Sequence, residues 1–220
     1  MTDFVIQGNR EGYLLGQKNS EFGDSWHTYH QFSTNLKTYQ ALSDDDMEYI
    51  KKLPQQMSVP IDDNFSIRMV HGSPFSAFDT ILEGKDELIT RSLDFIHENI
   101  LLCGHTHRTL MKRAHGKTLI NPGSVGLNFD KDSSAQYAFI VYENGTIKVE
   151  MKKVSYDFQA FKNTCDLSDF WVLLCIKSIE NGANYNLQFL EEAQAICGCF
   201  PIPNDVWDNL VKSWRELKQR

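Results

Sequence analysis

Hydrophobic and polar positions alternate in several short stretches of the chain, and this pattern predicts β-strands. Residues 65–70 alternate as a half-buried strand does, and residues 100–103 are entirely apolar, as in a fully buried strand. The dipeptide Asn144-Gly145 is typical of a tight hairpin turn between two strands. The predicted strands lie at residues 4–6, 65–70, 100–103, 110–113, 117–120, 137–142 and 146–151.

Helical spacing is clear in two segments of the first half. Ser43 suits an N-cap and three aspartates follow it, which predicts a helix through about Leu53. A second helix is expected over residues 85–98. Residues 12–42 are polar with scattered aromatic side chains and predict no defined element. A loop is expected between Pro54 and Pro60.

The chain changes character near residue 158, where helical spacing begins to dominate. Breaks near residues 181–182 and 201–203 divide this tail into helices. Strands and helices interleave early and hairpins come late, which predicts an α/β fold with mixed sheets. We therefore expect a first domain over residues 1–155 and a C-terminal helical extension over residues 156–220 that packs on it.

The composition is that of an ordinary globular protein of 220 residues, with 41% hydrophobic and 23% charged residues. No apolar run approaches the roughly 20 residues of a membrane span, and the N-terminus lacks the features of a signal peptide. A cytoplasmic location without membrane contact is expected. The five cysteines are an odd number, which argues against a disulfide framework.

The formal net charge of −7 argues against broad electrostatic binding of nucleic acid. A substrate that carries phosphate would need a strong local positive charge, and bound metal ions are the obvious source.

Four predicted loops carry polar side chains, and three of them directly follow strands. Polar groups at the ends of adjacent strands meet at one edge of a sheet. Imidazole suits Zn, Fe and Mn, and an amide oxygen adds a neutral ligand. Each motif alone also fits an ordinary turn, but together they predict a metal site. The four loops are Gly8-Asn9-Arg10-Glu11, His71-Gly72, Gly104-His105-Thr106-His107 and Asn121-Pro122-Gly123-Ser124.

The order GNRE, VHGSP, CGHTHR and INPGSVG resembles the calcineurin-like metallophosphoesterases, and most of all their small bacterial phosphodiesterase branch. The resemblance covers residues 1–155. It implies a sandwich of two mixed β-sheets flanked by helices, with two divalent ions (Mn, Fe or Zn) at the strand ends. It also implies hydrolysis of phosphodiesters or nucleotides by metal-activated water.

Carried over motif by motif, the resemblance makes Asn9, His71 and His105 ligands of one metal and His107 a ligand of the other. Asn9, His71 and Arg10 are the expected catalytic residues. Because arginine cannot act as a general acid, we expect Arg10 to clamp a phosphate oxygen; a solvated loop position is the alternative. Glu11 is expected to orient its loop.

Two motifs of the family do not occur where the pattern requires them. Asp-x-His is absent from the chain, and the one Gly-Asp, at residues 23–24, follows GNRE instead of preceding it. We therefore expect an N-terminally truncated member that binds one metal weakly, because its four ligands are all neutral. Open strand edges and apolar faces would then favour a homo-oligomer or a complementary N-terminal segment as partner.

Smaller roles and one alternative function complete the expectations. Gly123 and Ser124 are expected to form a wall of the site, and Thr106 is expected to hydrogen-bond within its own turn. The sequence leaves two functions open. The first is a phosphoesterase whose activity is impaired in this chain, and the second is a catalytically inactive protein-interaction module of the same fold.

Overall fold

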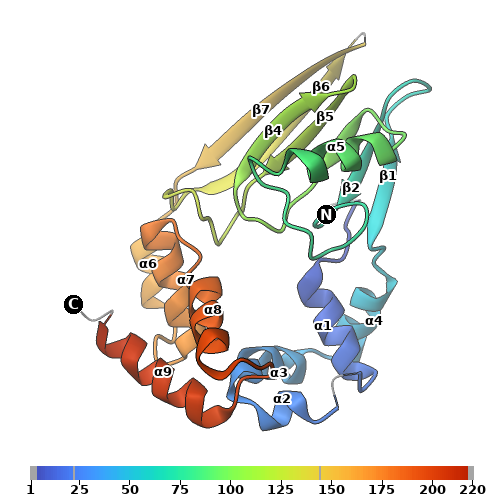
Figure 1. The fold of residues 1–220 in the computed structure, drawn as a ribbon. Coiled ribbons are helices and arrows are strands. Elements are labelled where there is room, and N and C mark those ends of the chain that lie inside the picture. Colours follow the sequence, from blue (N-terminus) through green and yellow to red (C-terminus); the bar gives the residue numbers. More distant parts are fainter. Residues whose placement is uncertain (1–3, 22, 144, 218–220) are drawn as a thin grey trace.

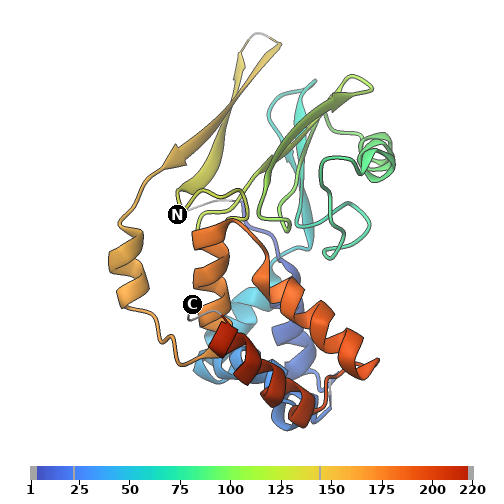
Figure 2. The same ribbon diagram turned by 60° about the vertical axis from the view of Figure 1, so that its left-hand side comes forward.

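The computed structural model of this protein describes residues 4–21, 23–143 and 145–217. Two β-sheets stack at one end of the molecule, and helices from both ends of the chain gather at the other end (Figures 1 and 2). Among the described helices, none combines the length and the apolar character that crossing a bilayer demands.

The larger sheet is mixed and has the strand order β1-β2-β3-β5-β4. Its three central strands β2, β3 and β5 are parallel, and β1 and β4 are antiparallel edge strands. The carboxyl ends of β2 and β3 therefore lie at the same edge of the sheet. The bounds are β1 Gln56–Pro60, β2 Ser66–Val70, β3 Ile100–Leu102, β4 Thr109–Ala114 and β5 Lys117–Pro122.

The second sheet is the antiparallel pair β6 (Ala135–Glu143) and β7 (Thr146–Val154). Its inner face packs on the larger sheet, where Ile140 and Val149 meet the buried Ile100. On the opposite face of the larger sheet, helix α5 (Asp86–Phe95) packs on Leu101. Successive strand residues point to opposite faces of a sheet. Ile100 of β3 therefore packs towards the second sheet, and its neighbour Leu101 packs towards α5.

The helical end combines segments from the start and the end of the chain. Trp171 Nε1 donates to the backbone carbonyl of Gln31 (2.9 Å), and Lys37 forms an ion pair with Asp169 (2.6 Å). These contacts join the N-terminal and C-terminal helices directly. The helices are α1 Asn9–Lys18, α2 Ser25–Thr28, η1 His30–Phe32, α3 Ser33–Ala41, α4 Asp44–Lys52, α6 Phe158–Asn163, α7 Phe170–Asn181, α8 Tyr185–Cys197 and α9 Asn204–Leu217.

Most of the predicted elements are confirmed, as is the α/β sandwich flanked by helices. Ser43 caps α4 by accepting from the backbone N–H of Asp46 (3.2 Å), and the tail is helical with breaks at the predicted places. The second sheet differs from the prediction of two mixed sheets, since its described strands are only antiparallel. Asn144 of the predicted hairpin turn lies outside the described residues.

Three local predictions are wrong. Residues 4–6 form no strand, because the segment is tied instead to the end of α4, where Gln7 donates to the carbonyls of Ile50 and Pro54 (both 2.9 Å). Residues 56–60 form strand β1, which tolerates Pro60 because it lies at the sheet edge. Residues 9–11 begin helix α1 instead of forming a loop.

Candidate metal centre

Three of the predicted ligands converge at one edge of the larger sheet. Asn9 Oδ1 lies 3.0 Å from His71 Nε2, and His105 Nδ1 lies 3.3 Å from the same nitrogen. Two imidazole nitrogens that bind one tetrahedral zinc ion by bonds of about 2.0 Å are separated by roughly 3.3 Å. The donor atoms of Asn9, His71 and His105 therefore fit a divalent cation.

The topology explains why these residues meet although they are far apart in the sequence. His71 directly follows β2, and His105 follows β3 after two intervening residues. The backbone N–H of Gly104 donates to the carbonyl of His71 (2.7 Å). Asn9 is the first residue of α1. A Cβ atom at Gly8 would lie 3.0 Å from both His71 Cε1 and Glu11 Oε2, so any larger residue would press on the imidazole and on the carboxylate that holds the start of α1.

Glu11 holds the start of α1. Its Oε2 accepts from the backbone N–H of Gly8 (2.8 Å), which confirms the expected orienting role.

Among the residues that the structure describes, no hydrogen bond or ring contact joins His107 to this trio. Its Nδ1 lies 2.6 Å from the backbone carbonyl of Leu127, and its ring stacks on Phe129 with centroids 5.2 Å apart. Because a carbonyl only accepts, Nδ1 carries the proton and Nε2 keeps the free lone pair, as in many metal-binding histidines. In the described part of the chain, no three His, Cys, Asp or Glu side chains are arranged to hold a metal ion.

The turn between β3 and β4 depends on one buried amide. His105 and His107 have φ angles of 63° and 56°, in the left-handed region that non-glycine residues rarely adopt. Asn121 Nδ2 donates to the carbonyl of Gly104 (2.8 Å) and to Thr106 Oγ1 (3.0 Å). Thr106 bonds within its own turn as expected, because its backbone N–H donates to the carbonyl of Gly104 (2.7 Å), whereas its hydroxyl accepts from Asn121 of β5.

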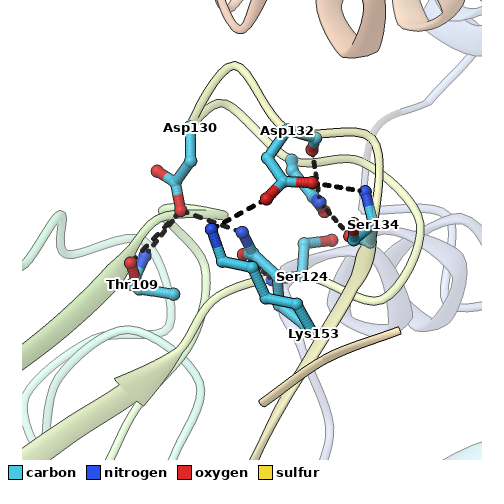
Figure 3. Close-up of polar contacts among 8 residues, drawn as sticks. Thr109, Ser124, Asp130, Asp132, Ser134 and Lys153 are labelled. Carbon is cyan, nitrogen blue, oxygen red and sulfur yellow. Dashed lines mark hydrogen bonds and ion pairs between the residues drawn. The ribbon is translucent and has the colours of Figure 1, made fainter. Parts of the chain in front are cut away.

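The segment that carries Leu127 is itself fixed by a polar network (Figure 3). Asp130 Oδ2 accepts from the backbone N–H of Thr109 (3.2 Å), and Asp132 forms an ion pair with Lys153 (2.8 Å). Hydrogen bonds from Lys153 and Ser134 hold the pKa of Asp132 well below its ordinary value. This network holds residues 127–134 in the position that lets Leu127 bind His107.

Gly123 and Ser124 support the same segment. Ser124 Oγ accepts from the backbone N–H of Leu127 (3.0 Å), and its own N–H donates to Gln136 Oε1 (3.2 Å). Gly123 has a φ of 93°, and a side chain there would lie 1.9 Å from the same Gln136 oxygen. Gly123 and Ser124 were expected to form a wall of the site. The structure shows them supporting the loop that carries Leu127, the partner of His107.

Residues 4–145 match the family described as the calcineurin-like phosphoesterase superfamily domain. This chain belongs to that superfamily. Its fold is similar to that of a hypothetical protein, PH1004, from Pyrococcus horikoshii OT3. That structure has 21% identity and a TM-score of 0.63, and the match covers 82% of this chain and 73% of that protein.

A metallophosphoesterase from Sphaerobacter thermophilus is similar to the same degree. Its identity is 20% and its TM-score 0.61, and the match covers 81% of this chain and 76% of that protein. Both likenesses show the fold. No curated protein sequence matches the chain.

The environment of the three histidines of this calcineurin-like phosphoesterase favours their neutral form. Burial is the main cause that lowers the pKa of His71, His105 and His107, and their mutual repulsion lowers the pKa of His71 and His105 further. Neutral imidazole is the form that coordinates a metal ion.

Two carboxylates also lie near the histidines. Glu11 raises the pKa of His71, and Asp79 raises that of His105, against the larger effect of burial. Nothing in the sequence pattern singled out Asp79, because it lies within the segment that folds back from His71.

Arg10 lies at the rim of the site, outside the trio. Its side chain is exposed, and Nη1 donates to Asn35 Oδ1 on α3 (2.7 Å). Its positive charge is close enough to lower the pKa of His107. A guanidinium has five N–H donors, so the bond to Asn35 leaves others for a second partner.

Proposed function

We propose that this chain is a metal-dependent phosphoesterase that hydrolyses phosphodiesters or nucleotides. The observation that carries the proposal is the convergence of Asn9 Oδ1, His71 Nε2 and His105 Nδ1 at the strand ends of a phosphoesterase-family chain. A divalent ion such as Mn, Fe or Zn, when bound there, supplies positive charge for phosphate oxygens and makes water more acidic.

The residues of the chain divide the remaining work. His71 and His105 are kept neutral by burial, and Asn121 fixes the turn that carries His105. Arg10, oriented by Asn35, clamps a phosphate oxygen by its remaining N–H groups. Arg10 thus binds and orients the phosphate, the histidines and Asn121 form the metal site, and none of these groups needs to transfer a proton.

The direct test is hydrolysis of bis-p-nitrophenyl phosphate by the purified chain with added Mn²⁺. We expect release of nitrophenolate that a chelator abolishes and that His71→Ala reduces by about 100-fold or more. His27→Ala is the matched control, because His27 is exposed and lies outside the trio. Activity that survives both the chelator and His71→Ala would contradict the proposal.

The clamp by Arg10 has its own test. Arg10→Lys keeps the charge but loses the planar donor set, so we expect KM to rise about tenfold with little change in kcat. Asn35→Ala should also raise KM, but by a smaller factor, because it removes only the hydrogen bond that orients the Arg10 guanidinium. An unchanged KM in Arg10→Lys, with activity retained, would remove the clamp.

We also propose that this chain binds one ion, and binds it weakly. The trio contains no carboxylate, and no hydrogen bond joins it to His107, whose Nδ1 bonds Leu127 instead. Acidic ligands normally offset the charge of two ions that lie roughly 3.5–4 Å apart. Titration calorimetry with Mn²⁺ or Zn²⁺ should give a stoichiometry of about one, whereas two tightly bound ions would contradict this proposal.

A cytoplasmic location remains part of the proposal. All five cysteines are free thiols, which agrees with a reducing compartment.

A non-catalytic interaction module is the second candidate, and the outer face of β6 favours it. Tyr137, Phe139 and Val141 point away from the sandwich, with 37%, 53% and 41% of their surfaces exposed. Apolar faces of this kind often mark contact surfaces. We propose a second copy of the chain as the partner. Light scattering should give a dimer that Phe139→Lys converts to monomer, whereas a wild-type monomer would contradict this alternative.

A further inference from the structure

The ring of Phe78 is exposed beside the candidate metal centre. Its exposed fraction is 53%, although phenylalanine rings usually lie inside a protein. The ring faces Tyr13 of α1 at a centroid distance of 5.7 Å and an interplanar angle of 55°. Two aromatic side chains from different segments therefore adjoin each other at this surface.

Both rings are tied to the ligand trio. The backbone of Phe78 lies close enough to the ring of His105 to raise its pKa. Tyr13 lies four residues after Asn9 in α1, so the two side chains share one face of the helix, one turn apart. The aromatic pair thus borders the trio on the side where α1 begins.

The segment that carries Phe78 is firmly held. The backbone N–H of Ser73 donates to the carbonyl of Ser76 (2.9 Å), and the hydroxyl of Ser73 donates to Asp79. A side chain at Gly72 would lie 2.6 Å from the carbonyl oxygen of Ser76, so the segment is folded tightly against the end of β2. The exposed ring is therefore presented by a fixed backbone.

Packing within the segment does not explain the exposure. Phe75, three residues earlier, lies under the guanidinium of Arg91 at 4.1 Å and contacts the ring of Phe95 at 5.0 Å. Phe78 instead faces Tyr13 of α1. Planar groups of ligands bind on such exposed aromatic faces by stacking.

We propose that Phe78, together with Tyr13, is a stacking platform for a planar aromatic group attached to the phosphate, such as a nucleobase. The inference rests on the proposed function for the position of the phosphate. It narrows the substrate class to phosphoesters of nucleosides or similar aromatic alcohols, and it makes Phe78 a specificity-determining residue.

The test compares AMP with ribose 5-phosphate, which differ only in the base. Titration calorimetry on the Mn²⁺-loaded chain should show AMP binding about tenfold more tightly or better, the usual effect of one stacked base. Phe78→Ala should remove this difference and leave the affinity for ribose 5-phosphate unchanged. Phe161→Ala is the matched control, because Phe161 is also exposed (44%) and also adjoins a tyrosine ring, but it lies on α6.

Each failure has a distinct signature. Equal affinities for the two compounds, no binding of either, or a preference for AMP that survives Phe78→Ala would each overturn the platform. Hydrolysis of bis-p-nitrophenyl phosphate with equal affinities leaves the proposed function intact and removes only the platform. If AMP binding depends on Phe78 but bis-p-nitrophenyl phosphate is not hydrolysed, the platform stands and the proposed function fails.

Discussion

At the scale of single residues, a buried amide does more for the site than any exposed polar group. Asn121 is fully buried, and both ends of its side chain are used, since its Oδ1 accepts from the backbone N–H of Gly123 (3.0 Å). A buried polar group is stabilising only when its hydrogen bonds are made. Here those bonds hold the left-handed turn that presents His105.

Asn121→Ala should therefore weaken both the fold and metal binding at the proposed site. We expect a loss of about 2–3 kcal/mol in the free energy of unfolding, because three hydrogen bonds disappear and their partners are buried (Thr106) or half-buried (Gly104 and Gly123). Affinity for Mn²⁺ should fall about 10-fold to 100-fold, as for other positioning residues. Chemical denaturation and calorimetry measure the two effects. Asn181→Ala, which removes an exposed amide bonded to Lys177, is the control.

Cys103 makes a second prediction at this scale. Burial raises the pKa of its thiol to about 12, and only 4% of the residue is exposed. At about pH 8 its thiolate fraction is about 10⁻⁴, so iodoacetamide should not modify it in the folded chain. Exposed Cys199 should react first, as mass spectrometry of peptides would show. Rapid labelling of Cys103 would mean that the end of β3 opens readily.

At the scale of elements, the strands beside the site are joined by a buried ion pair. Arg68 of β2 donates through Nε to Glu98 Oε1 (2.9 Å), and Ser58 of β1 donates to the same oxygen (2.7 Å). Burial raises the pKa of Glu98, but the hydrogen bonds from Ser58 and Arg68 outweigh this effect and leave it below its ordinary value. The pair thereby ties β1 and β2 to the turn before β3.

Glu98→Gln should lower the free energy of unfolding by about 2–3 kcal/mol near neutral pH. This value is at or below the lower end of the range for breaking a buried ion pair, because Arg68 is partly exposed. Because the folded pKa is depressed, this contribution is complete above the unfolded pKa of about 4.3 and is lost as the pH falls through the folded value. The difference between wild type and variant should shrink below about pH 4.

Denaturation at a series of pH values checks this prediction. Glu83→Gln is the control, because Glu83 forms an ion pair with Lys112 at 3.5 Å and its side chain is 85% exposed. A pair in that setting contributes little, so the control should leave stability nearly unchanged. An equal effect of both substitutions would show that burial of Glu98 is not what matters.

At the scale of the whole molecule, the two ends of the chain form one helical layer. Asn204 of α9 accepts from the backbone N–H of His30 (2.9 Å) and donates to the carbonyl of Thr28 (2.8 Å). Together with the contacts of Trp171 and Lys37, these bonds fasten the C-terminal helices to the segment that follows α1. The start of α1, which carries Asn9 and Arg10, is thus linked to the end of the chain.

Trp171→Phe tests this link. Removal of the indole N–H should lower stability by about 1 kcal/mol and speed the hydrogen exchange of the amides in residues 28–37. Trp214→Phe is the control, since its indole N–H donates to Glu192 within the C-terminal helices. That control should leave exchange in residues 28–37 unchanged, and an equal effect of the two variants would argue against a direct link.

The sequence by itself determined the elements whose signals are local. The alternation in β2, the apolar run of β3 and the cap at Ser43 are encoded by neighbouring residues, so their positions could be predicted. The histidines at the ends of β2 and β3 could also be assigned to one edge, because parallel strands end on the same side of a sheet. The resemblance to the calcineurin-like phosphoesterases, which rests on the same motifs, was confirmed by the family match over residues 4–145.

The tertiary structure decided what depends on contacts between distant segments. Residues 4–6 look like a strand, but Gln7 binds the end of α4, and Pro60 can lie in a strand only because β1 is an edge. The orientation of the His107 ring follows from its bond to Leu127, twenty residues later. The place of Phe78 beside Tyr13 follows from the fold-back after Gly72. No pattern of hydrophobic and polar positions records such contacts, because each depends on where two remote segments are brought together by folding.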